Sequence, residues 1–141
     1  MPPSPRPPEF FIDRGLGRVV VADAIRACGH VVHTMADVFG EREQQVADQE
    51  WLSEAGRHGW IVLTKDRRIR RRRTEIEAIA RHGVSAFVLA RGSLGAVAQA
   101  ECFVDNLDRI IEVSREHGAC VYEVRATSIR RLWPDKEANE R

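Results

Sequence analysis

Residues 58–68 read HGWIVLTKDRR, and this stretch shows an order of elements, a helix end, a glycine and an apolar strand, that recurs along the chain. Gly59 follows a helical segment and suits the left-handed position at which many helices end. An apolar, β-type run at residues 60–64 comes next, and Asp66 stands directly after it. A buried strand followed by a carboxylate is typical of α/β proteins, which bind ligands beyond the carboxyl ends of their strands.

The same order of helix, glycine and apolar strand recurs along the chain. Strands are expected at residues 10–12, 30–34, 60–64, 86–90 and 120–124, and helices at residues 16–28, 48–58, 74–82 and 94–116. The glycines expected to end helices in a left-handed conformation are Gly29, Gly59, Gly83 and Gly118. This alternation predicts a three-layer α/β/α fold with a five-stranded parallel sheet and right-handed crossovers.

Length and composition favour one domain. The chain has 141 residues, of which 43% are hydrophobic, enough for a single core. Residues 1–8 contain five prolines and predict a flexible leader, residues 9–126 the folded domain, and residues 127–141 a polar C-terminal tail. No apolar run is long enough for a membrane span or a secretory signal, and three widely spaced cysteines suggest no disulfide framework. We therefore expect a cytoplasmic protein without a membrane partner.

Charge is unevenly distributed along the chain, although the net charge is only +1. Residues 35–54 carry six acidic side chains against one arginine, whereas residues 65–82 carry eight basic side chains against three acidic ones. An acidic and a basic segment so close together indicate a metal or acid site beside an anion-binding surface.

Four aspartates are expected at one edge of the sheet. Asp13, Asp37 and Asp66 follow the first three strands, and Asp48 opens the helix that precedes the third. Crowded carboxylates raise one another's pKa unless a cation neutralises them, and oxygen ligands suit Mg²⁺ or Mn²⁺. Such a metal can activate water against a phosphodiester. Asp13 and Asp66 can share it only if the first and third strands are neighbours, which favours the strand order 2-1-3-4-5.

Each aspartate also has a simpler interpretation. Asp48 suits a helix N-cap, Asp37 an Asx-turn in a loop, and Asp66 an ion pair with the arginines that follow it. Asp13 is hardest to explain in this way, because a charge directly after a buried strand costs free energy unless something binds it.

Arginine occupies six of the seven positions from 67 to 73. Thr74 and Glu77 match a capping box, which predicts that the next helix begins at Thr74 and leaves the arginines in an adaptable loop. Arginine contacts to phosphates provide affinity for nucleic acid that does not depend on base sequence. The side chains predicted to contact nucleic acid are Lys65, Arg67, Arg68, Arg70, Arg71, Arg72 and Arg73. A solvated charged surface, or a docking surface for an acidic partner protein, stays open as an alternative.

Three short strings together resemble the PIN-like nucleases, in particular the short branch that includes VapC-type toxins of toxin–antitoxin pairs. The strings are FFIDRGLG at residues 10–17, DQEWL at residues 48–52 and VLTKDRRIR at residues 62–70. The resemblance covers residues 9–124. It implies a Mg²⁺- or Mn²⁺-dependent endoribonuclease with Asp13, Asp48 and Asp66 as catalytic and metal-binding residues, RNA as substrate and a cognate antitoxin as partner.

A fourth acidic ligand is implied by the resemblance, and one position departs from the family. Asp37 is the expected fourth ligand, with Glu41 and Glu43 as the alternatives. Many relatives carry a second acid two residues after the aspartate that corresponds to Asp66, and here that position is Arg68. The number of metal ions, one or two, therefore stays open.

Three functions remain as hypotheses. The first is a metal-dependent endoribonuclease, and the second is a PIN-like module that binds nucleic acid without cleaving it. The third, a phosphoacceptor domain of the receiver type, fits least well, because the first strand is followed by one aspartate and the last ends in Glu123-Val124-Arg125 rather than in a lysine. A monomer and a homodimer are equally compatible with the sequence.

Overall fold

Six strands form one sheet in the order β2-β1-β3-β4-β5-β6 in the computed structural model, which describes residues 7–135. The strands are β1 (Glu9–Ile12), β2 (Val31–Thr34), β3 (Ile61–Thr64), β4 (Ser85–Leu89), β5 (Cys120–Val124) and β6 (Ile129–Trp133). The first five pair in parallel, and β6 pairs antiparallel to β5. The predicted strand order 2-1-3-4-5 is therefore confirmed.

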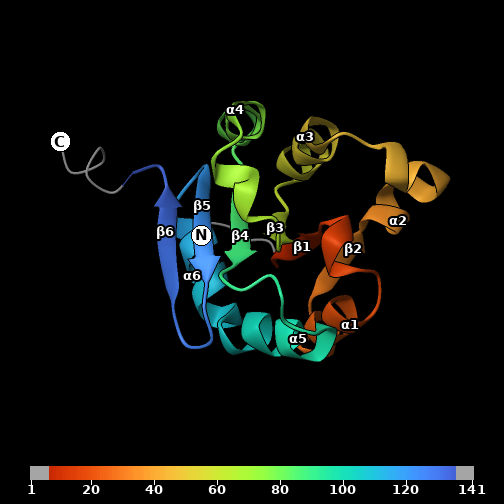
Figure 1. The fold of residues 1–141 in the computed structure, drawn as a ribbon, viewed down its shortest axis with the longest axis vertical. Helices are drawn as coiled ribbons and strands as arrows, with labels where there is room; N and C mark the ends of the chain where they lie inside the picture. The colour runs from red at the N-terminus through yellow and green to blue at the C-terminus, as the bar shows by residue number, and fades with distance from the viewer. Residues whose placement is uncertain (1–6, 136–141) are drawn as a thin grey trace, which may run out of the picture.

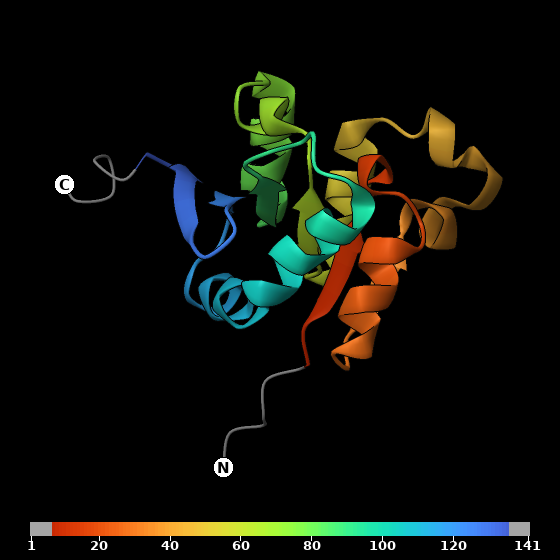
Figure 2. The same cartoon turned by 60° about the horizontal axis from the view of Figure 1, so that its bottom comes forward.

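Helices cover both faces of the sheet, as predicted (Figure 1). They are α1 (Val20–Ala27), α2 (Met35–Phe39), α3 (Asp48–His58), α4 (Arg73–His82), α5 (Ala96–Asp105) and α6 (Leu107–Glu116), with short 3-10 turns η1 (Arg14–Leu16), η2 (Gly40–Gln45) and η3 (Arg67–Arg70). Helices α3 and α4 lie on one face, and α1, α5 and α6 on the other (Figure 1). Figure 2 shows α5 running alongside α1.

Alternation along β1 explains why the sheet has a core on each face. Phe10 and Ile12 pack into the cluster beneath α1, α5 and α6, whereas Phe11 packs into the cluster beneath α3 and α4. The Phe11 ring stacks on Trp51 of α3 and on Trp60, with ring centroids 5.5 and 5.9 Å apart. A strand buried on both faces in this way is typical of a parallel sheet between helical layers. Within residues 7–135, each helix is too short or too polar to cross a lipid bilayer.

The expectation of five strands was wrong, because β6 adds an antiparallel edge to the sheet. This strand lies within residues 127–141, which the sequence suggested were a polar tail. Leu132 and Trp133 pack against one core cluster and Ile129 against the other. The pattern was hidden because two arginines separate these apolar residues. Residues 1–6 of the expected Pro-rich leader and residues 136–141 of the expected tail lie outside the described range.

Two predicted helices are interrupted. The segment 94–116 forms two helices instead of one, because the Asn106 side chain donates hydrogen bonds to the carbonyl oxygens of Cys102 and Arg125 and ends α5 there. The helix predicted for residues 16–28 begins only at Val20, after the turn η1 that ends at Leu16. A long-range contact made by a polar side chain is invisible to helical periodicity, which reports only the buried face.

Two local predictions at helix ends were also wrong. Helix α4 begins at Arg73, and Thr74 donates to Glu75 instead of forming a capping box with Glu77. The expected left-handed glycines at 29, 59 and 83 have φ values of 93°, 72° and 68°, but Gly118 does not have a positive φ. Helix α6 ends at Glu116, and the next residue, His117, is already extended, so this helix end does not require a left-handed residue at Gly118.

Candidate active site

A cleft of about 610 Å³ opens where the carboxyl ends of β1 and β3 meet the first residue of α3. The described residues that line it include Asp13, Asp48 and Asp66, together with the basic residues Arg14, Lys65, Arg67, Arg68 and Arg72. The neighbouring positions of β1 and β3 in the sheet bring Asp13 and Asp66 together, as the predicted strand order requires.

Thr64, the last residue of β3, links the two strand-end aspartates. Its hydroxyl donates a hydrogen bond of 2.9 Å to Asp13 Oδ2 and accepts one of 3.0 Å from the backbone N–H of Asp66. The backbone N–H of Asp13 also donates to the carbonyl of Leu63 at 3.1 Å. The threonine therefore orients the Asp13 carboxylate and holds the turn that presents Asp66, so Thr64 is a positioning residue of this cleft.

Asp13 is buried, with 8% of its surface exposed. Burial raises the pKa of Asp13, and the nearby negative charge of Asp48 raises it further, while the Thr64 hydrogen bond opposes both effects. A carboxylate in such surroundings gains most from a cation nearby, because a cation offsets both the lost hydration and the repulsion.

Asp48 is the first residue of α3, and it does not act as the helix N-cap. Ala47 occupies that position and makes no side-chain capping bond. Instead, the indole N–H of Trp51 donates a hydrogen bond of 2.9 Å to Asp48 Oδ1. Because Trp51 is buried against Phe11, this bond ties the orientation of the Asp48 carboxylate to the core.

A single guanidinium lies among three carboxylates at the wall of the cleft. Arg72 Nη1 is 3.5 Å from Asp48 Oδ2, 3.5 Å from Asp66 Oδ2 and 3.4 Å from Glu75 Oε1. The other Asp66 oxygen accepts from the backbone N–H and from Nε of Arg68, at 3.1 and 3.2 Å. Arg72 therefore supplies part of the positive charge that this acidic site requires.

Glu75 is a buried acidic residue of the same group that the sequence analysis did not select. Burial raises the pKa of Glu75, but hydrogen bonds involving Thr74, Asp48 and Arg72 outweigh that effect and lower it below the ordinary value. The signal available in the sequence was its spacing: Glu75 stands three residues after Arg72, at the start of a helix, where the two side chains can meet.

Arg14, directly after Asp13, joins the end of β1 to the segment before α3. Its Nη2 donates to the carbonyl oxygens of Glu43 and Val46, at 2.8 and 2.6 Å. These bonds anchor the chain just ahead of Asp48 and set its position relative to Asp13. The sequence gives no local signal for this role of Arg14, because the role depends on contacts between residues about 30 positions apart.

The three candidates for a fourth acidic ligand lie outside the residues that line the cleft within 7–135. Asp37 forms a capping box with Thr34 at the start of α2 and pairs with Arg26 at 3.2 Å. These interactions lower the pKa of Asp37, the largest contribution being the hydrogen bond from the Thr34 backbone. Glu43 is buried and pairs with Arg18, and Glu41 is exposed on η2.

The basic segment divides into two groups. Lys65, Arg67, Arg68 and Arg72 line the cleft, whereas Arg70, Arg71 and Arg73 are not among its lining residues within the described chain. Arg73 pairs with Glu77 along α4 at 3.1 Å. Residues 67–70 form the turn η3, and the Asp66 side chain caps it by accepting from the backbone N–H of Arg68, so this stretch is an ordered turn.

The donor chemistry of the cleft fits a hard divalent cation. Asp13, Asp48 and Asp66 offer oxygen ligands only, the type that Mg²⁺ and Mn²⁺ prefer. As placed, however, no three acidic, histidine or cysteine side chains of residues 7–135 converge closely enough to enclose an ion. Arg72 forms ion pairs with two of these carboxylates, and displacement of the Arg72 side chain would leave their oxygens free to bind a metal ion.

The parallel sheet and the aspartates at its edge define a PIN-like arrangement, and comparison with known proteins agrees. The family described as "PIN like domain" matches residues 8–91. The chain is 32% identical over 124 residues to "Putative ribonuclease VapC45" of Mycobacterium tuberculosis (strain ATCC 25618 / H37Rv), covering 87% of this chain and 90% of that protein. No solved structure matches this chain significantly. The chain belongs to the PIN-like domain family, as its sequence motifs predicted.

Proposed function

We propose that this protein is a Mg²⁺- or Mn²⁺-dependent endoribonuclease in which Asp13, Asp48 and Asp66 hold the metal. The observation that carries the proposal is a single cleft, at the switch between β1 and β3, that is lined by three aspartates from three separate elements, two of which pair with Arg72. The name of the mycobacterial relative supports a ribonuclease of the VapC type.

The chain's own residues would prepare this site for a phosphodiester. Thr64 orients Asp13, and Trp51 orients Asp48, each through one hydrogen bond to the core side of the cleft. Lys65, Arg67 and Arg68 on the rim would attract the RNA backbone. Bound Mg²⁺ or Mn²⁺ would supply water activation and would neutralise charge developing on the phosphate.

The same proposal includes a biological setting. The VapC likeness supports a toxin with a cognate antitoxin protein as partner. The three cysteines are free thiols within the described residues, which is consistent with a cytoplasmic location. Copurification of the chain with the product of a neighbouring small reading frame would identify such a partner.

A PIN-like module that binds RNA without cleaving it is the second candidate. The observation favouring it is Arg72, which already pairs with Asp48 and Asp66. Arg68 also stands where many relatives carry an additional acid. If Arg72 cannot leave, the carboxylates keep their internal partner and the arginines alone bind RNA.

Cleavage of a labelled RNA with Mg²⁺, with Mn²⁺ and with a chelator tests the proposal directly. Asp13→Asn should lower the metal-dependent rate at least about a hundredfold, because even outer-shell partners of metal sites contribute 10–100-fold. Asp37→Asn is the matched control, since an amide can still cap α2 and Asp37 lies outside the cleft. Cleavage that persists at the wild-type rate in Asp13→Asn would remove the aspartate cleft as the site of cleavage, whereas its loss in Asp37→Asn would restore Asp37 as a ligand.

A further inference from the structure

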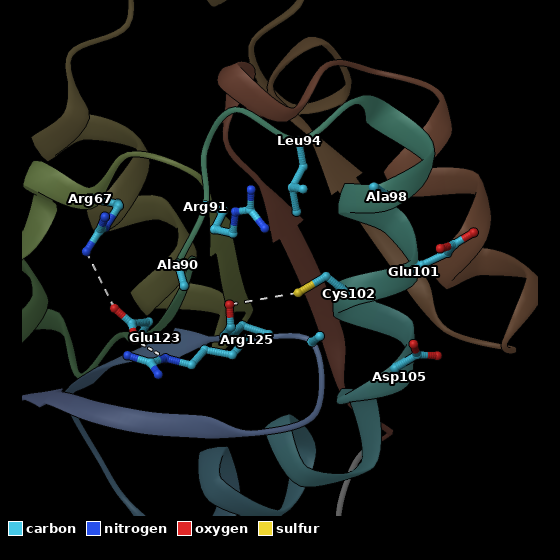
Figure 3. Close-up of a pocket in the computed structure, with 12 residues that line it drawn as sticks. Arg67, Ala90, Arg91, Leu94, Ala98, Glu101, Cys102, Asp105, Glu123 and Arg125 are labelled. Atoms are coloured by element: carbon cyan, nitrogen blue, oxygen red, sulfur yellow. Dashed lines mark hydrogen bonds and ion pairs between the residues drawn. The ribbon is translucent and has the colours of Figure 1, made fainter.

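A second cavity, of about 590 Å³, opens at the same sheet edge between the ends of β4 and β5 and helix α5 (Figure 3). The cleavage chemistry proposed above does not use it. Its volume falls within the roughly 300–1,000 Å³ of small-molecule sites, which combine apolar walls with a few placed polar groups.

Apolar side chains form two opposing walls of this cavity. Leu94, Ala98 and Cys102 lie on the α5 side, and Ala90 and Val124 lie at the strand ends. In Figure 3, Leu94 and Ala98 stand across the cavity from Ala90. Apolar surfaces on both sides suit the two faces of a flat ring better than a sugar or a free phosphate.

Polar groups lie on both sides of the cavity: the α5 side also carries Glu101 and Asp105, and the strand side carries Glu123 with its arginines. Glu123 is buried, and its Oε1 accepts from Arg125 Nε at 2.7 Å, while Oε2 has a longer contact of 3.6 Å to Arg67 Nη2. Oε2 therefore keeps capacity to accept a further hydrogen bond. The Arg91 side chain extends into the space between the end of β4 and α5 (Figure 3). The cavity thus offers a fixed acceptor and a planar cation beside apolar walls.

The cavity is adjacent to the aspartate cleft. Arg67 lines both spaces, and the successive residues Arg91 and Gly92 line the cavity and the cleft respectively. A chain whose phosphate lies in the cleft would therefore place a neighbouring residue at the cavity mouth, with Arg67 between them.

We propose that this cavity binds one unstacked nucleobase of the RNA whose phosphate lies in the aspartate cleft. The inference rests on the proposed function. RNA recognition commonly uses splayed bases that stack on side chains, including the planes of arginines. Glu123 Oε2 accepts a hydrogen bond from the base, so bases with an exocyclic amino group bind more tightly than uracil, which lacks one.

Titration of the full chain with CMP, AMP, GMP, UMP and ribose 5-phosphate, with a chelator present, tests this site without cleavage. Ala98→Phe fills the cavity from α5 and should weaken CMP, AMP and GMP binding at least tenfold. Val97→Phe is the matched control, because Val97 is 65% exposed on the same helix. Ribose 5-phosphate binding as tight as the nucleotides, or unchanged nucleotide binding in Ala98→Phe, would overturn the inference, because either result leaves only anion attraction by arginines.

A second variant covers the case in which Ala98→Phe does not fold. Arg91 is exposed and pairs with none of residues 7–135, so Arg91→Gln should fold normally and weaken nucleotide binding severalfold. The two proposals fail separately. Metal-dependent cleavage with no nucleotide binding removes the base site alone, whereas nucleotide binding without cleavage in wild type removes the nuclease alone.

Discussion

Two buried carboxylates at the same sheet edge have opposite electrostatic surroundings. Asp13, after β1, is 8% exposed and forms no ion pair with an arginine in the described part of the chain. Glu123, in β5, is 2% exposed and pairs with Arg125, Arg130 and Arg67. Burial raises the pKa of both groups, but the three arginines outweigh burial at Glu123 and lower its pKa, whereas the pKa of Asp13 stays raised.

This contrast separates a structural carboxylate from one available to an external cation. Glu123 already has its counter-charges, so its ionised form stabilises the folded chain. Asp13 is buried without an ion pair, and its charge is favoured only by hydrogen bonds from the Thr64 hydroxyl and the Arg14 backbone and by a weaker attraction to the Arg14 side chain, which do not outweigh burial. An unpaired buried charge in a cleft is a common mark of a functional site, since selection for stability alone would remove it.

Removing the negative charge should have different effects at the two carboxylates, and the loss of stability at Glu123 is the largest stability effect we expect. Glu123→Gln should lower the free energy of unfolding at pH 7 by about 1–3 kcal/mol, because a buried, charge-assisted hydrogen bond is lost. Asp13→Asn should leave the melting temperature unchanged or raise it, because repulsion from Asp48 and the burial of a charge are both relieved. Thermal melts of the two variants beside wild type provide the measurement.

The pH dependence of these melts sharpens the comparison. The lowered pKa of Glu123 means that its stabilisation is present above the unfolded value of 4.5 and is lost as pH falls through the folded pKa. The raised pKa of Asp13 has the opposite sign: the ionised carboxylate is disfavoured in the folded state, so any advantage of Asp13→Asn shrinks as pH falls through the raised folded pKa and is gone below the unfolded value of 3.8. If Asp13→Asn melts at a lower temperature than wild type at neutral pH, the proposed contrast between Asp13 and Glu123 is wrong.

Removing the internal cation of the cleft is expected to have an intermediate effect. Arg72→Gln should raise the affinity for Mn²⁺ roughly fivefold to tenfold, because two partly exposed ion pairs of about 0.2–1 kcal/mol each, with the proposed ligands Asp48 and Asp66, no longer compete with the metal. Calorimetric titration without RNA measures this. Arg73→Gln is the control, since Arg73 is 91% exposed and pairs with Glu77 on α4. Equal Mn²⁺ affinities in both variants would show that Arg72 does not compete for the carboxylates.

The smallest effect is expected outside the cleft, at Arg70 and Arg71. If both contact RNA phosphates, Arg70→Gln/Arg71→Gln should lower the salt slope of RNA binding by about 1.4, at about 0.7 per contact on a single strand. KM for cleavage should rise while kcat stays near wild type, since the aspartates are untouched. Affinities at two salt concentrations provide the slope.

The alternative role of these two arginines is the docking of an acidic partner such as an antitoxin. In that case the double variant would keep the wild-type salt slope for RNA and would lose the copurifying protein. Pull-down of the partner by wild type and by the double variant separates the two roles.

Much of the fold could be predicted because its determinants are local. Apolar runs, and glycines such as Gly59 and Gly83 with positive φ, mark where strands begin and helices end. Residues after parallel strands share one edge of a sheet, so Asp13 and Asp66 could be placed together before the structure was known.

Only the tertiary structure decided which charges meet. Asp37 follows a predicted strand, as Asp13 does, yet it pairs with Arg26, while Glu75 joins Asp48 and Arg72. Asn106 divides a periodic helix through bonds to a turn about 20 residues away. The physical reason is range: backbone preference and burial pattern act over a few residues, whereas a charged or polar side chain is satisfied by whichever partner the packed chain brings within about 3 Å.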